Sequence, residues 1–192
     1  SADDVPMLAR MCELTLRSGR HEATADLLDK VLVRVESEPA LVHAAAEARV
    51  RAGRIDDAIP LLGSYAKAQA HPSIWTHKLG LLGRQGRLDE AYAVARDWAQ
   101  AQPHQADAHA ELATGAEMRG DVALARQAAD RALSLDAQQP KALNIAAAYE
   151  LKSGKPGAHC SALAALNTEK LSGGARSARA FLLGYAADRS GD

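Results

Sequence analysis

Small and apolar residues recur along this chain in blocks that repeat about every 34 positions. Small residues lie seven places before and five places after most members of a glycine series, and larger apolar residues lie nine and twelve places after them. Residues three or four apart share one face of a helix, so each block predicts two amphipathic helices that cross at the small residues. A period of this length indicates an array of repeated units. The glycines, in steps of 34, 33, 34, 34 and 37 residues, are Gly19, Gly53, Gly86, Gly120, Gly154 and Gly191.

The same series predicts where the helices end and begin. Each glycine is expected to end a helix in the left-handed conformation. Pro39, Pro72 and Pro140 each stand 14 residues before a glycine, and proline suits the first turn of a helix. The first helices of the hairpins are expected at about 5–18, 39–52, 73–85, 105–119, 139–153 and 175–189. The second helices are expected at about 21–36, 55–69, 88–101, 122–135 and 157–168.

Three segments carry a family resemblance: Leu183-Gly184 before Gly191, Trp75 followed by Gly86-Arg87-Leu88-Asp89-Glu90-Ala91, and Gly53-Arg54-Ile55-Asp56-Asp57-Ala58. From about Val5 to Asp192 the chain resembles the tetratricopeptide repeat (TPR) family, whose period is 34 residues. The resemblance implies an all-α, right-handed TPR solenoid, a superhelix of antiparallel helix hairpins. Its single array would have repeats at about 5–38, 39–72, 73–104, 105–138 and 139–172, with a sixth first helix at 175–192.

The chain departs from the family pattern in the first, third and fifth repeats. Thr24 and His159 stand where the family prefers alanine, and Leu79-Gly80 suggests that the pattern slips by one residue in the third repeat. The fifth repeat also carries Pro156-Gly157 at the start of its second helix, so we expect it to be the least regular joint.

The composition of the chain argues against several classes of function. Hydrophobic residues make up 47% of the chain but aromatic residues only 4%, which indicates an alanine-rich, all-helical protein. A net charge of -1 gives no field that would attract nucleic acid, and no apolar run approaches the ~20 residues of a membrane span. Cys12 and Cys160 lie about four repeats apart, so we expect two small buried thiols. Free thiols favour the cytoplasm, with the periplasm left open.

The resemblance implies a non-catalytic scaffold for protein–protein interaction that binds a peptide or helix in its concave groove. Ligand contacts in the family cluster at fixed places in the first helices, and side chains of mixed polarity suit a peptide or a helix. Carried over to this sequence, the expected contact residues are His43, Glu47, Arg51, Thr76, Arg84, Thr114, Glu117, Asn144, Lys152 and Tyr185.

The residues give no sign of catalysis or of a metal site. The histidines lack the HxxxH and HExxH spacings of metal sites. His43 and His77 are expected to approach each other across adjacent first helices, but two ligands do not make a metal site. No serine or cysteine is paired with a histidine as a nucleophile would be. We therefore predict no metal, no cofactor and no enzyme activity of the chain's own.

Two other functions stay open. The segment from Leu166 to Asp192 is similar to the stretch ahead of the last repeats in bacterial TPR-containing sulfotransferases, so the array could be an N-terminal, substrate-recruiting arm of a bacterial sulfotransferase or glycosyltransferase. It could also be a periplasmic scaffold in polysaccharide export or cytochrome maturation. Because Gly191 would begin a further turn, we expect a longer bacterial protein. Edge-to-edge self-association through exposed terminal repeats is a further expectation.

Overall fold

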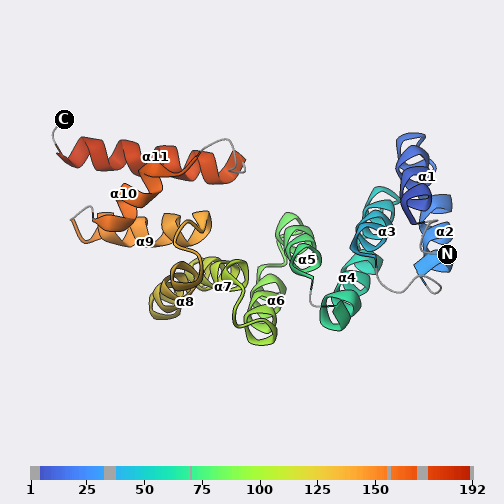
Figure 1. Cartoon of the computed structure of the whole chain (residues 1–192), viewed down its shortest axis with the longest axis horizontal. Helices are drawn as coiled ribbons and strands as arrows, with labels where there is room; N and C mark the ends of the chain where they lie inside the picture. The colour runs from blue at the N-terminus through green and yellow to red at the C-terminus, as the bar shows by residue number, and fades with distance from the viewer. Residues whose placement is uncertain (1–4, 33–37, 70, 155–156, 168–172, 191–192) are drawn as a thin grey trace. The chain divides into compact units, whose positions relative to one another are not determined.

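A computed structural model describes residues 5–32, 38–69, 71–154, 157–167 and 173–190. In these residues the chain forms eleven helices and no strand (Figure 1). They are α1 (Val5–Arg17), α2 (His21–Leu32), α3 (Pro39–Arg51), α4 (Ile55–Gln69), α5 (Pro72–Arg84), α6 (Leu88–Ala101), α7 (Ala106–Met118), α8 (Val122–Leu135), α9 (Pro140–Lys152), α10 (Ala158–Ala165) and α11 (Gly173–Ser190). The helix pairs predicted from the glycine series are therefore confirmed.

The chain packs as two compact units, residues 1–94 and 95–192. In the first unit, consecutive helices from α1 to α5 lie against one another, and the first helices α1, α3 and α5 also touch in turn. In the second unit, α7 to α11 repeat this arrangement, with α7, α9 and α11 as the successive first helices. Each unit thus has helix hairpins whose first helices are neighbours.

Glycine closes the turn within each hairpin. Gly53 has a φ of 78°, in the left-handed region that side chains avoid. The following residue, Arg54, donates its backbone N–H to the carbonyl oxygen of Arg49 at 2.7 Å, which caps the end of α3. The prediction of left-handed glycines is confirmed for the five described members of the series; Gly191 lies outside the described residues. The five are Gly19, Gly53, Gly86, Gly120 and Gly154.

Prolines begin three of the first helices, as predicted. Pro39, Pro72 and Pro140 each occupy the first residue of their helix, where no intrahelical N–H bond is needed. Pro60 differs, because it lies inside α4 with an exposed side chain. The last second helix is the least regular one: α10 has 8 residues, whereas α2 has 12 and α4 has 15.

Small residues fill the places where helices cross. Ala46, Ala113 and Ala125 have no exposed surface, and Thr24 is buried with its hydroxyl donated to the carbonyl oxygen of Arg20 at 2.7 Å. Thr24 therefore replaces the preferred alanine by satisfying its own polar group within the helix. Both cysteines are buried free thiols, as predicted, and burial raises the pKa of each.

The predicted slip in the third repeat is wrong. Gly80 is exposed, so α5 keeps its phase relative to Gly86, and the half-buried Leu79 stands where other repeats hold a small residue. A separate close approach lies at Gly63 on α4, where an added Cβ would lie 2.7 Å from Lys78 Nζ. Gly184, another predicted crossing residue, is also exposed, and a Cβ added there would contact no other group.

Candidate functional site

The expected contact residues divide between the two units. His43, Glu47 and Arg51 lie on α3, and Thr76 and Arg84 lie on α5, all in the first unit. The second unit holds the other five, which are Thr114 and Glu117 on α7, Asn144 and Lys152 on α9, and Tyr185 on α11. All of them therefore lie on first helices.

In the first unit, a histidine network joins α3 to α5. The Nδ1 atoms of His43 and His77 lie 2.9 Å apart, and the two rings stack with their centroids at 5.1 Å. His43 Nε2 lies 2.7 Å from Ser73 Oγ, which lies 2.8 Å from His71 Nδ1. The predicted approach of His43 and His77 is thus confirmed, and Ser73 and His71 extend it in a way that the repeat pattern did not predict.

Burial and neighbouring charges disfavour the charged form of both paired histidines. The pKa of His43 is lowered, first by burial and then by His71. The pKa of His77 is lowered by burial, by His43 and by Arg84, against an opposing effect of Glu47. The pair is therefore mainly neutral at neutral pH.

Some of the other expected residues of the first unit already form hydrogen bonds within the chain. Arg51 Nε donates to Glu47 Oε1 at 2.7 Å one turn away on α3. Thr76 donates its hydroxyl to the carbonyl oxygen of Pro72 at 3.0 Å, so its polar group is used within its own helix. Arg84 is exposed, and no ion pair joins it to another described residue of the chain. The guanidinium of Arg84 is therefore available to a partner.

In the second unit, Asn144 stands out among the expected residues. Its Oδ1 atom is buried and has no hydrogen-bond partner among the described residues. Buried acceptors are nearly always hydrogen-bonded in proteins, so an open one calls for an explanation. Thr114, by contrast, donates its hydroxyl to the carbonyl oxygen of Ala110 at 2.9 Å.

Tyr149 on α9 gathers charged residues from three helices. The guanidinium of Arg126 lies 5.4 Å from the ring centroid of Tyr149, and Lys152 Nζ lies 5.2 Å from it. Burial raises the pKa of Tyr149, and the charge of Glu117 raises it further. Two expected residues, Lys152 and Glu117, thus act on Tyr149, a residue that the family's contact positions do not include. One feature of the sequence could have identified Tyr149. It is an aromatic residue five places before Gly154, where the first four repeats hold Leu14, Ala48, Leu81 and Gly115.

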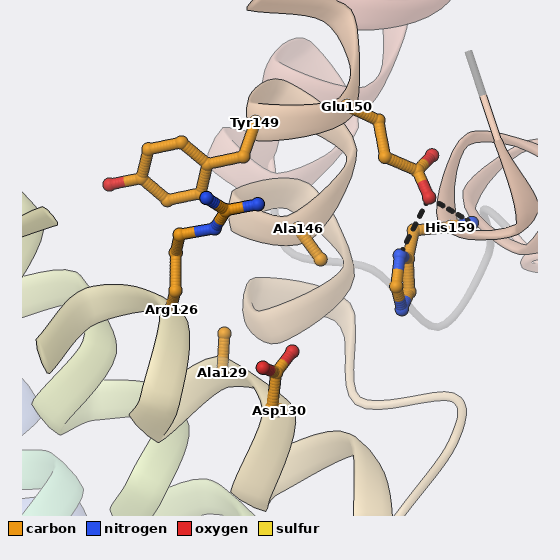
Figure 2. A pocket seen from close by; sticks show the side chains of 7 residues that line it. All are labelled: Arg126, Ala129, Asp130, Ala146, Tyr149, Glu150 and His159. Carbon is orange, nitrogen blue, oxygen red and sulfur yellow. Dashed lines mark hydrogen bonds and ion pairs between the residues drawn. The ribbon is translucent and has the colours of Figure 1, made fainter. Parts of the chain in front are cut away.

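A cavity of about 200 Å³ lies beside Tyr149, between α8, α9 and α10 (Figure 2). Its lining residues are Arg126, Ala129, Asp130, Ala146, Tyr149, Glu150 and His159. None of them is among the expected contact residues: four lie on the second helices α8 and α10, and the other three lie on α9 at places other than the expected contact positions. The remaining expected residue, Tyr185, has 37% of its surface exposed.

Glu150 forms one wall of this cavity and holds the start of α10. Its carboxylate accepts the backbone N–H groups of Gly157 at 2.9 Å, His159 at 3.2 Å and Cys160 at 3.0 Å. It also lies 2.8 Å from His159 Nδ1 (Figure 2). Burial raises the pKa of Glu150, but the hydrogen bonds from Cys160 and His159 outweigh it and bring the pKa to about 2. An ionised carboxylate from α9 therefore caps α10, and His159 is part of that cap.

Within the described ranges, no group of three or more histidine, cysteine, aspartate or glutamate residues could hold a metal ion. No helix in the same part of the chain is long and apolar enough to cross a membrane.

Comparison with known proteins identifies the fold. No protein-family model matches the chain, and no curated protein matches it significantly. Solved structures do match over nearly the whole chain. MamA from Desulfovibrio magneticus RS-1, from residue 41 to its end, shares 15% identity over 97% of each chain with a TM-score of 0.54. TTC0263, a thermophilic TPR protein of Thermus thermophilus, shares 19% identity over 93% of this chain and 98% of its own, with a TM-score of 0.56.

A tetratricopeptide repeat protein from Parabacteroides merdae matches 98% of this chain and 77% of its own, with a TM-score of 0.61 and 14% identity. Identities this low establish the fold and leave the partner undetermined. The structural likeness agrees with the hairpins, the left-handed glycines and the small crossing residues described above. The chain therefore has the all-α fold of the tetratricopeptide repeat proteins.

Proposed function

We propose that this chain is a protein-interaction scaffold without catalytic activity of its own, and that a peptide or helix of a partner binds along the first helices. The observation that carries the proposal is the open acceptor of Asn144. Its buried Oδ1 lacks a partner at one of the expected contact positions, among the residues that the structure describes. Asn144 as a whole is only half-buried, so rotation of its side chain would present this oxygen to a backbone N–H of a bound segment, which is how an extended or helical peptide gains specificity.

The first unit offers a second contact surface of the same kind. His43, Glu47 and Arg51 on α3 and Arg84 on α5 present both signs of charge, which suits a segment of mixed polarity. The enzyme-arm and periplasmic alternatives, and self-association through the terminal repeats, stay predictions. Exposed apolar residues on the terminal helices, including Met7 and Phe181, are consistent with self-association.

The test begins with a peptide selected from a random display library against the whole chain. Its Kd is then measured for the wild type and for Asn144→Leu, which has nearly the same size but no acceptor. A lost hydrogen bond of about 1 kcal/mol corresponds to about fivefold weaker binding. Removal of an unsatisfied buried acceptor does not destabilise the chain, so weaker binding would not reflect unfolding. Gln127→Leu, on the exposed side of α8, is the matched control and should bind as the wild type does.

A second variant tests the first unit. Glu47→Lys combined with Arg51→Glu reverses the two charges but keeps an ion pair one turn apart, so helicity should be unchanged. Peptides that bind this unit should lose affinity. If selected peptides bind both variants as tightly as the wild type, the first helices are not the binding surface.

A further inference from the structure

The cavity beside Tyr149 has the size of one side chain. Its volume is about 200 Å³, whereas clefts for drug-sized ligands have about 300–1,000 Å³. An engineered cavity of about 150 Å³ holds one benzene ring. Ala129, Ala146 and the ring of Tyr149 provide apolar walls. The cavity can therefore take a side chain with an apolar stem and a polar end.

The carboxylate of Glu150 already accepts hydrogen bonds from within the chain. It receives three backbone N–H groups and the ring of His159, so its lone pairs are taken up by the start of α10. Because an ionised carboxylate can only accept, His159 Nδ1 must carry the hydrogen of that bond. In the neutral ring, Nε2 then keeps its lone pair and is an acceptor at the cavity wall.

Asp130 supplies the second open acceptor. It lines the cavity from α8, and no hydrogen bond or ion pair joins its carboxylate to another described residue. In the view of Figure 2, Asp130 lies between Arg126 on one side and His159 on the other. Among the described residues, the carboxylate and Nε2 thus leave two acceptors without donors on the lining of one cavity.

Arg126 does not fill this need. Its guanidinium lies beside the ring of Tyr149 (Figure 2), at 5.4 Å from the ring centroid, and forms no ion pair with Asp130 one turn further along α8. The attraction between the cation and the ring stabilises the guanidinium beside Tyr149, away from Asp130. A charged donor could therefore bind to Asp130, which is exposed, and to His159, which is half-buried, in place of water.

We propose that this cavity binds the side chain of an arginine from a partner protein, with its methylenes against Ala129 and Ala146 and its guanidinium donating to Asp130 and to His159 Nε2. A planar guanidinium can donate to two acceptors at once, which an ammonium does less well. This binding position is separate from the proposed first-helix contacts, because its acceptors come from α8 and α10. It gives the second unit an anchor for one basic residue.

The test uses N-acetyl-L-arginine amide as the probe and the whole ¹⁵N-labelled chain. Saturable chemical-shift changes are expected at the amides of Ala129, Asp130 and Ala146. Asp130→Asn removes the charge with little change in shape and should weaken the fitted Kd about tenfold, the effect of losing a charge-assisted hydrogen bond. Asp97→Asn, an exposed aspartate of α6 with the same change of charge, should leave the Kd unchanged.

Two probes of other chemistry complete the design. N-acetyl-L-lysine amide should bind more weakly than the arginine probe, and N-acetyl-L-glutamate amide should cause no saturable change. The proposal is overturned if the glutamate probe shifts the cavity amides, because that result would mean that the cavity binds an anion through Arg126. It is also overturned if Asp130→Asn binds the arginine probe as well as the wild type, or if the arginine probe gives no saturable shift. Asn144→Leu should bind the probe normally, so failure here is distinct from failure of the first-helix proposal.

Discussion

His43 on α3 and His77 on α5 face each other with their Nδ1 atoms 2.9 Å apart, although 34 residues separate them in the chain. A hydrogen bond between these two nitrogens holds one proton, which one ring donates and the other accepts. If both rings became imidazolium, both nitrogens would carry hydrogen and the contact would break. The link between successive first helices in the first unit therefore depends on the protonation of this pair.

This link makes stability depend on pH. Burial lowers the pKa of both histidines below 6.5, their ordinary value. Between that value and the lowered pKa, the unfolded chain binds more protons than the folded chain, so the free energy of unfolding rises with pH. We expect the contribution of the pair to be fully present above about pH 6.5 and to be lost as the pH falls below it. Urea denaturation at several pH values between about 5 and 8 measures the effect.

A matched pair of variants isolates that contribution. His77→Gln should flatten the dependence of unfolding free energy on pH in this range, because one partner no longer titrates. The exposed His104→Gln should keep the wild-type dependence. Equal slopes for the wild type and His77→Gln would mean that the pair does not set the pH dependence. Charges near the pair, at His71, Glu47 and Arg84, are the same in both variants.

A buried arginine makes a second prediction. Arg49 is almost fully buried within α3 and donates to Asp29 on α2 and to the carbonyl oxygen of Ala45 at 3.0 Å. Asp29→Ala should lower the free energy of unfolding by about 1–3 kcal/mol, because it leaves a buried charge without its partner. The loss is smaller than for a fully buried pair, since water reaches Asp29.

The double variant distinguishes this explanation from a general loss of packing. Arg49→Met together with Asp29→Ala removes the charge as well as its partner, and should be more stable than Asp29→Ala alone. Chemical denaturation of the two variants measures the difference. A double variant less stable than the single one would contradict the account.

Overpacking tests the crossing of α7 and α8. Ala125 has no exposed surface, so Ala125→Leu should force the helices apart and lower the free energy of unfolding by about 1–3 kcal/mol. Ala123→Leu makes the same substitution on the exposed side of α8 and should change stability little. Thermal melts of the two variants compare them directly. Ala91 is a poorer place for this test, because it is only half-buried.

The cap on α10 makes a prediction about local exchange. Glu150→Gln leaves one weaker acceptor for the N–H groups of Gly157, His159 and Cys160, and should cost about 1–3 kcal/mol. Hydrogen exchange of these amides should become faster, while the amides of α8 serve as an internal reference. Unchanged exchange at Cys160 would show that α10 begins without the help of Glu150. Because the pKa of Glu150 is about 2, the wild-type cap should weaken as the pH falls from about 4.5 toward that value.

The helices could be predicted from sequence because their signals are local. Gly53 ends α3 through its own backbone torsion, and Pro39 begins the same helix through its ring. Neither effect depends on a residue that is distant in the sequence. The exposed Gly80 shows the limit of this reasoning, since the repeat pattern predicted a crossing residue there and the packing of α5 leaves it at the surface.

The candidate sites were less accessible to sequence because long side chains choose their partners through packing. Arg49 reads as one more charged residue in an alanine-rich helix, and only the placement of α2 against α3 brings Asp29 to it. The cavity beside Tyr149 likewise needs α8, α9 and α10 together. His43 and His77 could be predicted to meet because both lie on first helices one period apart.

The glycine turns have a consequence for how such a chain can change length. At Gly53 and Gly120 a Cβ atom would meet no other group within 4 Å, so the turn relies on torsion and on backbone bonds such as Asp121 N–H to Ala116 O at 2.9 Å. Because such a turn needs no particular side chain around it, it can be duplicated or deleted without substitutions at neighbouring residues. Duplication or deletion of a whole hairpin between two such glycines therefore preserves every joint, and leaves only the helix faces to be matched.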